Sequence, residues 1–261
     1  MPEFARPTVT LHYRDEGAGP PLVFLHGWCD SSATWGALLP RFAGEFRCIA
    51  PDMRGHGASG RPFDHAYFPE ALANDVAALC GELGIERPVL IGHSFGGFLA
   101  AFIAARMPGF ARGIAVIDQP LALGEFAAQM RAIAPVIRSP ETHLAFRQQL
   151  FGSMFGGLTG PAREGVEARS AATPPEVALG LWAPLFEFSE EEMAALGGRL
   201  LAALEGQPSL VIEGMDHPGY PELLAQAAPA ARVVRIPAGH WVQLERPTET
   251  EAALRSFLAG V

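Results

Sequence analysis

The residue with the clearest chemical potential in this sequence is Ser94, which lies between Gly92 and Gly96 in a Gly-x-Ser-x-Gly motif. The apolar run Val89–Ile91 comes directly before the motif, and an apolar helical pattern follows it. A short strand that ends in this motif and opens a helix is typical of a nucleophile elbow, in which the serine hydroxyl stands clear of the sheet. A serine hydroxyl is a weak nucleophile until a base takes its proton, so the motif also predicts a partner base.

The segments around the motif alternate between strand-like and helix-like patterns, which predicts a mostly parallel sheet covered on both faces. Strands are expected at residues 8–13, 22–26, 46–50, 89–91, 113–118, 208–212 and 233–236. Helices are expected at residues 70–83, 98–106 and 248–258, the last with Thr248 as its N-cap.

Four loops that follow predicted strands carry residues suited to chemistry: His26–Trp28, Asp52–Ser59, Ser94 and Gly239–His240. In an open parallel sheet, ligands bind at the carboxyl ends of the strands, so we expect these loops to meet. By these motifs and their order, the chain resembles the α/β-hydrolase fold family over essentially its whole length. The resemblance implies an α/β fold with a mostly parallel central sheet flanked by helices and a helical cap insertion.

The resemblance also implies a role for each motif. Ser94 corresponds to the nucleophile and His240 to the general base, and the backbone N–H groups of Trp28 and Phe95 correspond to the oxyanion hole. A serine at this position argues against the branches of the family that use an aspartate nucleophile, the haloalkane dehalogenases and the soluble epoxide hydrolases.

The acid that orients the histidine has two candidates. The common family position is the loop after the penultimate strand, often Gly-x-x-Asp, and here Asp216 lies one residue early in Gly214–Pro218. Asp118, at the end of the strand expected at 113–118, is the other position from which a carboxylate can reach the histidine. We prefer Asp118, because the shortening changes the direction in which Asp216 would point, and Asp216 stays the alternative.

Residues 119–189 interrupt the alternation with helical pieces separated by prolines and glycines. We interpret this segment as a helical cap on a core formed by residues 1–118 and 190–261. Its apolar content predicts a small, hydrophobic substrate, for which His26, Trp28 and Trp182 are candidate binding residues.

The composition of the chain limits the classes of partner that it is expected to bind. The net charge of −9 argues against nucleic acid. The first residues lack the pattern of a secretory signal, no apolar stretch is long enough for a membrane helix, and the three cysteines form no Cys-x-x-Cys pair. We therefore expect a cytoplasmic protein that acts on a small molecule without a metal or other cofactor. The oligomeric state cannot be read from the sequence.

Three functions are compatible with these motifs. The first is a serine hydrolase that cleaves an ester, lactone or related acyl bond through a Ser-His-Asp triad and an acyl-enzyme. The second is a cofactor-independent oxygenase with a His/Asp dyad, which the chain resembles at Gly27–Cys29, at Arg54–Gly57 and in the strand ending at Asp118. Asp30 departs from that resemblance, since those enzymes carry a histidine there. The third is a noncatalytic receptor for a small hydrophobic molecule.

Overall fold

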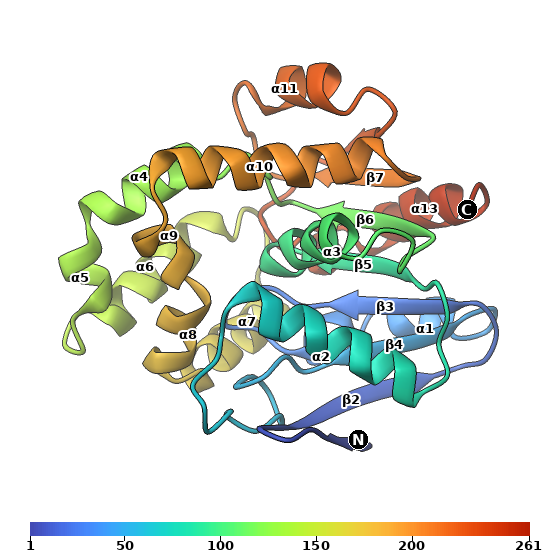
Figure 1. Cartoon of the computed structure of the whole chain (residues 1–261), viewed down its shortest axis with the longest axis horizontal. Helices are drawn as coiled ribbons and strands as arrows, with labels where there is room; N and C mark the ends of the chain where they lie inside the picture. The colour runs from blue at the N-terminus through green and yellow to red at the C-terminus, as the bar shows by residue number, and fades with distance from the viewer.

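The computed structural model describes residues 1–261 and contains a single eight-stranded sheet with the order β1-β2-β4-β3-β5-β6-β7-β8 (Figure 1). The two strands at the N-terminal edge pair antiparallel, and all pairs from β4 through β8 are parallel. This confirms the predicted fold class. The strands are β1 (Glu3–Ala5), β2 (Thr10–Glu16), β3 (Pro21–Leu25), β4 (Arg47–Pro51), β5 (Val89–His93), β6 (Gly113–Ile117), β7 (Ser209–Glu213) and β8 (Arg232–Arg235).

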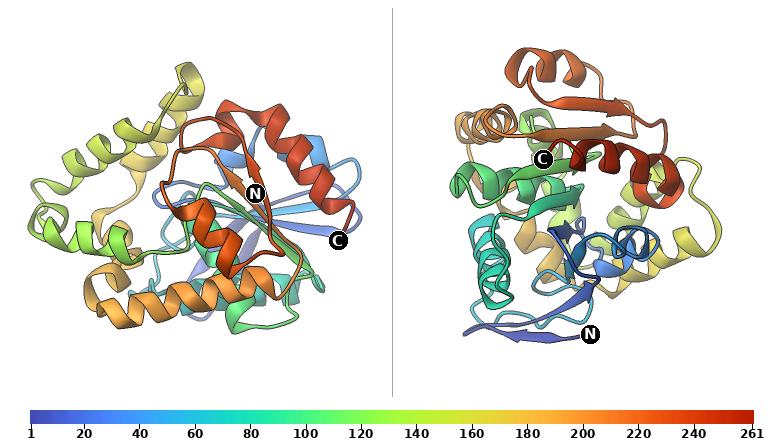
Figure 2. Two further views of the ribbon diagram at one scale, coloured as in Figure 1. Left: turned by 90° about the horizontal axis from the view of Figure 1, so that it is seen from above. Right: turned by 90° about the vertical axis from the view of Figure 1, so that its right-hand side faces the viewer.

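Helices cover both faces of the sheet (Figure 2). On one face, α3 packs against β5 and β6 and is flanked by α2 and α10, while α1, α12 and α13 pack on the other face. The helices are the 3-10 helix η1 (Ser32–Trp35), α1 (Leu39–Phe42), α2 (Pro69–Glu82), α3 (Phe95–Arg106), α4 (Gly124–Ala132), α5 (Ala134–Arg138), α6 (His143–Met154), α7 (Gly160–Ala172), α8 (Pro175–Leu181), α9 (Ala183–Glu187), α10 (Glu190–Glu205), α11 (Tyr220–Ala227), α12 (Val242–Glu245) and α13 (Pro247–Leu258). None of them has both the length and the apolar composition needed to span a membrane.

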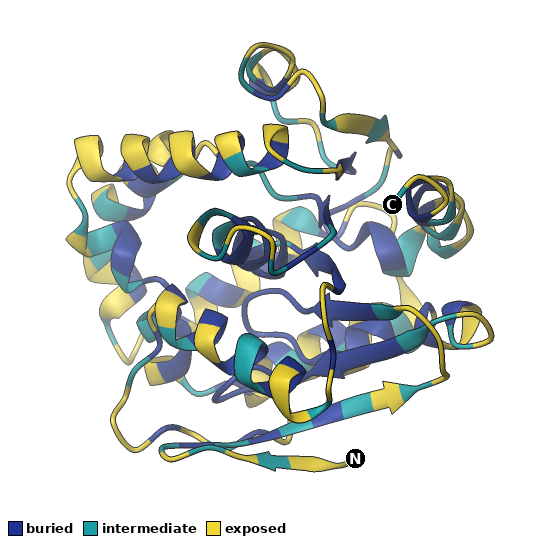
Figure 3. Ribbon diagram, turned by 45° about the vertical axis from the view of Figure 1, so that its right-hand side comes forward, coloured by how far each residue is buried: buried dark blue, intermediate teal, exposed yellow.

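The central strands are apolar at nearly every position because each of their faces is covered. In β5 every residue is buried, and Figure 3 shows the sheet as a buried layer between helices with exposed outer faces. Side chains of a strand point alternately to its two faces. Accordingly, Leu90 belongs to the larger apolar cluster on the α3 face, and Val89 and Ile91 belong to the smaller cluster on the α13 face.

The six helices α4–α9 follow β6 in the chain and precede α10, with no strand among them. They lie together beyond the ends of β3, β5 and β6 (Figure 1). Close approaches join this layer to the loops that follow strands: a Cβ on Gly55 would meet Val177, and one on Gly239 would meet the backbone of Phe155. These six helices lie within residues 119–189, and their role as a cap stays a prediction.

Several boundaries differ from the sequence-based expectation. The short edge strand β1 was not predicted, and α3 begins at Phe95 instead of residue 98. The prediction that Thr248 caps the last helix is wrong. Helix α13 begins at Pro247, whose fixed φ suits the first helical position, so Arg246 is the N-cap and Thr248 lies inside the first turn.

Candidate active site

Ser94 stands on a tight turn between β5 and α3, with φ of 52° and ψ of −127°. Two glycines permit this turn. A Cβ on Gly92 would lie 2.0 Å from the carbonyl oxygen of Gly96, and a Cβ on Gly96 would lie 2.1 Å from that of Leu25. Because no side chain fits at either position, the strand can turn directly into the helix and leave the serine partly exposed at the corner.

His240 follows β8 and makes three hydrogen-bond contacts, one through its ring and two through its backbone. Its Nδ1 lies 2.7 Å from Oδ2 of Asp118, its carbonyl oxygen accepts from Nε2 of His93 at 2.8 Å, and its N–H donates to the carbonyl of Met154 in α6 at 2.8 Å. Since Nδ1 is occupied by the carboxylate, Nε2 is the ring nitrogen that can take a proton from a hydroxyl.

Asp118 is buried at the end of β6 with a left-handed φ of 49°. Its second oxygen, Oδ1, accepts from the N–H groups of Gly214 at 2.7 Å and Met215 at 2.9 Å and from Nε2 of His217 at 3.3 Å. Burial by itself raises the pKa of this carboxyl. Hydrogen bonds from His217, His240 and Gly214, together with the charge on His240, outweigh burial and hold the pKa of Asp118 far below its usual range. The group is therefore a carboxylate at neutral pH.

Asp216, the alternative acid, does not reach the histidine. Its side chain is 88% exposed, and its charged neighbour is Arg235 at 3.9 Å. Of the two acids that the sequence left open, the structure brings Asp118, and not Asp216, to His240.

The loop His26–Trp28 lies against the elbow, because a Cβ on Gly27 would lie 3.2 Å from Cβ of Ser94. The Trp28 N–H donates to no backbone acceptor. Phe95 is the first residue of α3, where an N–H has no acceptor within the helix. Two unpaired donors beside the serine, one of them at the positive end of a helix, could stabilise a developing oxyanion.

Trp28 and Trp182 form an aromatic pair that joins the core to the cap. Their rings stack at 3.9 Å with an interplanar angle of 12°, and Trp28 Nε1 donates to the carbonyl of Ala178 at 2.8 Å. Phe126 and Phe146 approach Trp182 edge-on. Both indoles are almost fully buried, and the role of Trp28 and Trp182 in substrate binding stays a prediction.

His26 does not fit the predicted role in substrate binding. Its Nδ1 contacts the carbonyl of Gly27 at 2.8 Å, and its Nε2 accepts from the N–H of Met53 at 2.9 Å. The ring is fully buried. With both nitrogens occupied by backbone, His26 ties the loop after β3 to the loop after β4 and has no polar atom left for a ligand.

Sequence reasoning missed an acidic residue that joins three parts of the site. Asp30 is buried, and its Oδ1 accepts from Ser31 N–H at 2.8 Å and from Nε of Arg169 in α7. Its Oδ2 accepts from Nε1 of Trp241 at 3.2 Å. Burial raises the pKa of Asp30, but the charges of Arg169 and His26 outweigh it and lower that pKa. No sequence signal marks this pair, because 139 residues separate Asp30 from Arg169.

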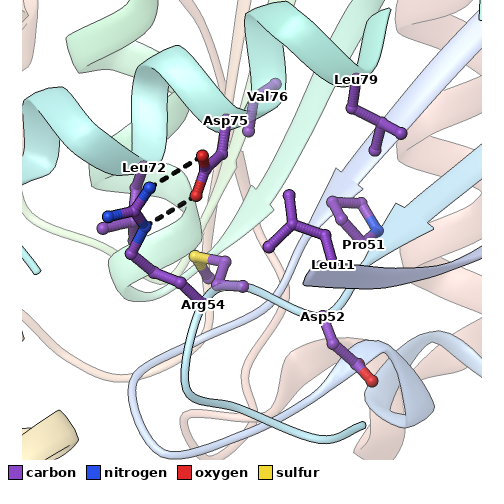
Figure 4. Close-up of a pocket in the computed structure, with 9 residues that line it drawn as sticks. Leu11, Pro51, Asp52, Arg54, Leu72, Asp75, Val76 and Leu79 are labelled. Atoms are coloured by element: carbon purple, nitrogen blue, oxygen red, sulfur yellow. Dashed lines mark hydrogen bonds and ion pairs between the residues drawn. The ribbon is translucent and has the colours of Figure 1, made fainter. Parts of the chain in front are cut away.

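The glycine-rich turn after β4 is structural. Arg54 forms a two-pronged ion pair with Asp75 of α2, at 2.7 and 2.8 Å, and both side chains are buried (Figure 4). The cavity of about 10 Å³ beside this pair has room for about one water molecule. It is therefore too small to hold a substrate. No group of three or more His, Cys, Asp or Glu side chains is arranged to hold a metal ion.

The chain is similar in sequence and fold to known proteins. The family model described as alpha/beta hydrolase fold matches residues 20–247. A 2-(acetamidomethylene)succinate hydrolase of Mesorhizobium japonicum is 33% identical over 147 residues, which are 53% of this chain and 52% of that relative. The chain thus spans about half the length of this curated relative. Other matched relatives are named haloalkane dehalogenase and epoxide hydrolase.

Solved structures with a similar fold include proteins named as a lactone-degrading enzyme, an esterase and an epoxide hydrolase. Est816, titled an N-acyl homoserine lactone degrading enzyme, superposes with a TM-score of 0.82 at 25% identity and covers 98% of this chain and 100% of its own. A thermophilic esterase from Thermogutta terrifontis has a TM-score of 0.82 at 26% identity, with 100% and 99% coverage. The family model matches most of the chain, and the chain folds into an eight-stranded sheet that carries the elbow. The chain therefore belongs to the α/β-hydrolase fold family.

Proposed function

We propose that the protein is a serine hydrolase that cleaves an ester, lactone or related acyl bond of a small, hydrophobic substrate. The observation that carries this proposal is the 2.7 Å contact between Asp118 Oδ2 and His240 Nδ1, with the His240 ring 4.7 Å from the ring of His93, the residue directly before Ser94. Nucleophile, base and acid follow β5, β8 and β6, so three strands of one sheet position them at the same edge.

The geometry supports an acyl-transfer sequence. The Ser94 oxygen attacks the substrate carbonyl, and Nε2 of His240 accepts the hydroxyl proton. Asp118 holds the tautomer with hydrogen on Nδ1 and stabilises the imidazolium that forms. The N–H groups of Trp28 and Phe95 bind the tetrahedral oxyanion. His240 then protonates the leaving group, and it activates the water that hydrolyses the acyl-enzyme.

The choice of an acyl bond rests on the nucleophile and on the neighbours. The dehalogenase and epoxide hydrolase branches use an aspartate nucleophile, whereas position 94 of this chain is a serine. Two similar solved structures are named as an esterase and a lactone-degrading enzyme, and another is named as an epoxide hydrolase. The apolar residues of the cap that pack around Trp182 favour a hydrophobic acyl group over a sugar or a phosphate.

Labelling with a fluorophosphonate probe tests the proposal directly. Wild-type protein should become labelled, Ser94→Ala should not, and Ser153→Ala, which removes an exposed serine of α6, should be labelled like wild type. The same three proteins are then assayed on a panel of p-nitrophenyl esters and lactones, and turnover should follow the labelling. Wild-type protein that never reacts with the probe and turns over no member of the panel would refute the proposal.

One observation favours a second candidate, the cofactor-independent oxygenase. The acid partner of His240 is Asp118, at the end of β6, which is the position that those enzymes use. Against it, Asp30 replaces their histidine and is engaged by Arg169 and Trp241. Oxygen consumption with an N-heteroaromatic hydroxyl substrate that persists in Ser94→Ala would favour this candidate over the hydrolase.

A further inference from the structure

The loop between β7 and α11, residues 214–219, wraps around the carboxylate of Asp118. Gly214 and Met215 direct their N–H groups to Oδ1 of Asp118. His217, the fourth residue of the loop, directs Nε2 to the same oxygen at 3.3 Å. Asp118 therefore lies between two histidines, with His217 on Oδ1 and His240 on Oδ2.

The ring of His217 is held in place by its own neighbours. Tyr220 presents its ring edge-on at 6.5 Å, and the Tyr220 hydroxyl accepts from the N–H of Leu121 at 3.1 Å. Leu121 belongs to the segment that follows Asp118, so the loops after β6 and β7 are tied together at two points. The side chain of His217 is 22% exposed, which leaves the Nε2–H bond to Asp118 on its sheltered side.

Other charged groups surround this histidine. Glu213, the buried last residue of β7, and Asp216, on the same loop, are its acidic neighbours, and Arg235 at the end of β8 is the nearby cation. Neither acid is hydrogen-bonded to the ring. The one polar side chain that His217 contacts is the carboxylate of Asp118.

We propose that His217 is a positioning residue of the triad: its Nε2–H anchors Oδ1 of Asp118 so that Oδ2 stays directed at His240. This inference rests on the proposed serine hydrolase. A carboxylate can rotate about its bond to Cβ, and donors on one oxygen fix the direction of the other. Two of the three donors are backbone groups, so His217 supplies the side-chain anchor that can be removed without rebuilding the loop.

The test compares three variants in steady-state ester hydrolysis across a pH series. His217→Leu removes the donor, whereas His217→Gln keeps an N–H near the position of Nε2. His12→Leu is the matched control, because His12 is 23% exposed in its side chain and lies 3.4 Å from Glu3 on the far edge of the sheet. We expect kcat to fall roughly tenfold in His217→Leu with little change in KM, and to return largely to the wild-type value in His217→Gln. The control should match wild type.

The pH profile separates positioning from general damage to the fold. Without this anchor, Oδ2 of Asp118 is less well directed and stabilises the protonated His240 ring less, so the acidic limb of kcat/KM should move to lower pH in His217→Leu. Loss of active protein would lower the curve without moving this limb. A His217→Leu enzyme with wild-type kcat and an unmoved acidic limb would overturn the inference, as would a His217→Gln enzyme that is as impaired as His217→Leu.

Nuclear magnetic resonance of ring-¹⁵N-labelled histidines gives a readout that needs no turnover. In wild-type protein His217 should carry a proton on Nε2, and a ring protonated on Nδ1 alone would refute the inference even if His217→Leu fails to fold. The Hδ1 signal of His240 should move in His217→Leu and not in His12→Leu. If Ser94 proved unreactive, so that the hydrolase proposal failed, these signals would still decide whether His217 acts on the Asp118–His240 pair.

Discussion

Replacing Asp118 with asparagine should abolish most of the activity by inverting the tautomer of His240. The oxygen at the Oδ1 position receives three donors, from Gly214, Met215 and His217. An asparagine must therefore place its carbonyl oxygen there and turn its NH₂ group toward His240. That NH₂ donates to Nδ1, which leaves the ring proton on Nε2, and a protonated Nε2 cannot accept the proton of Ser94.

The expected loss follows from this geometry. The donors on Oδ1 remain satisfied, so Asp118→Asn should fold, and the defect should fall on kcat. Enforcing the wrong tautomer in a serine triad lowers kcat by a factor on the order of 10⁴, or about 5 kcal/mol of transition-state stabilisation. Asp216→Asn removes a carboxylate that is 88% exposed and makes no hydrogen bond to His240, so its activity should stay within about twofold of wild type.

The assay is kcat and KM for a p-nitrophenyl ester that wild-type protein cleaves, with circular dichroism to verify the fold of each variant. Two results would refute the reasoning. One is an Asp118→Asn enzyme that keeps more than about a tenth of wild-type kcat, and the other is a large loss in Asp216→Asn. Either result would mean that the carboxylate at the end of β6 does not set the tautomer of His240.

Two further predictions concern stability. Arg169→Leu leaves the buried Asp30 without its charged partner and should lower the free energy of unfolding, measured by urea titration, by about 3 kcal/mol. The double variant Asp30→Asn/Arg169→Leu should lose less stability, because no unpaired buried charge remains. Equal losses in the two variants would contradict this account. The pKa of Asp118 is lowered in the folded state, so its ionised form stabilises the fold above the unfolded value of about 3.9, and this stabilisation is lost as pH falls toward the lowered value. The gap in unfolding free energy between wild type and Asp118→Asn should therefore stay constant above about pH 5 and shrink as pH falls below about 4. A gap that does not shrink in this acidic range would argue against a strongly stabilised carboxylate.

The parts of the fold that the sequence predicted well are those whose cause is local. The strand before Ser94 and the helix after it follow from a short apolar run, two glycines and a helical pattern that are contiguous in the chain. The edge strand β1 has three residues and pairs on one side with β2, so it leaves almost no pattern to detect. The error at Thr248 is also local, since Pro247 takes the first helical position and moves the cap one residue earlier than the proline.

The parts of the site that the sequence left open depend on contacts between distant residues. The choice between Asp118 and Asp216 was undecided because it turns on where the loop after β7 points its backbone N–H groups. His26 resembles a ligand-binding residue until its two backbone partners are known. No role for Asp30 could be predicted from the sequence, since its partners Arg169 and Trp241 come from α7 and from the loop of His240.

The position of the acid at the end of β6 has a simple geometric basis. Strands β6 and β7 are adjacent and parallel, with Ile117 opposite Ile212, so the residues that follow them emerge side by side at the same edge, about 4.8 Å apart. A carboxylate from either strand can therefore reach the same histidine. In this chain β6 supplies the carboxylate, and the loop after β7 supplies the N–H donors that hold it, including His217. The acid can thus follow either of the two strands. The N–H donors around the acid fix its orientation, and through it the tautomer of His240.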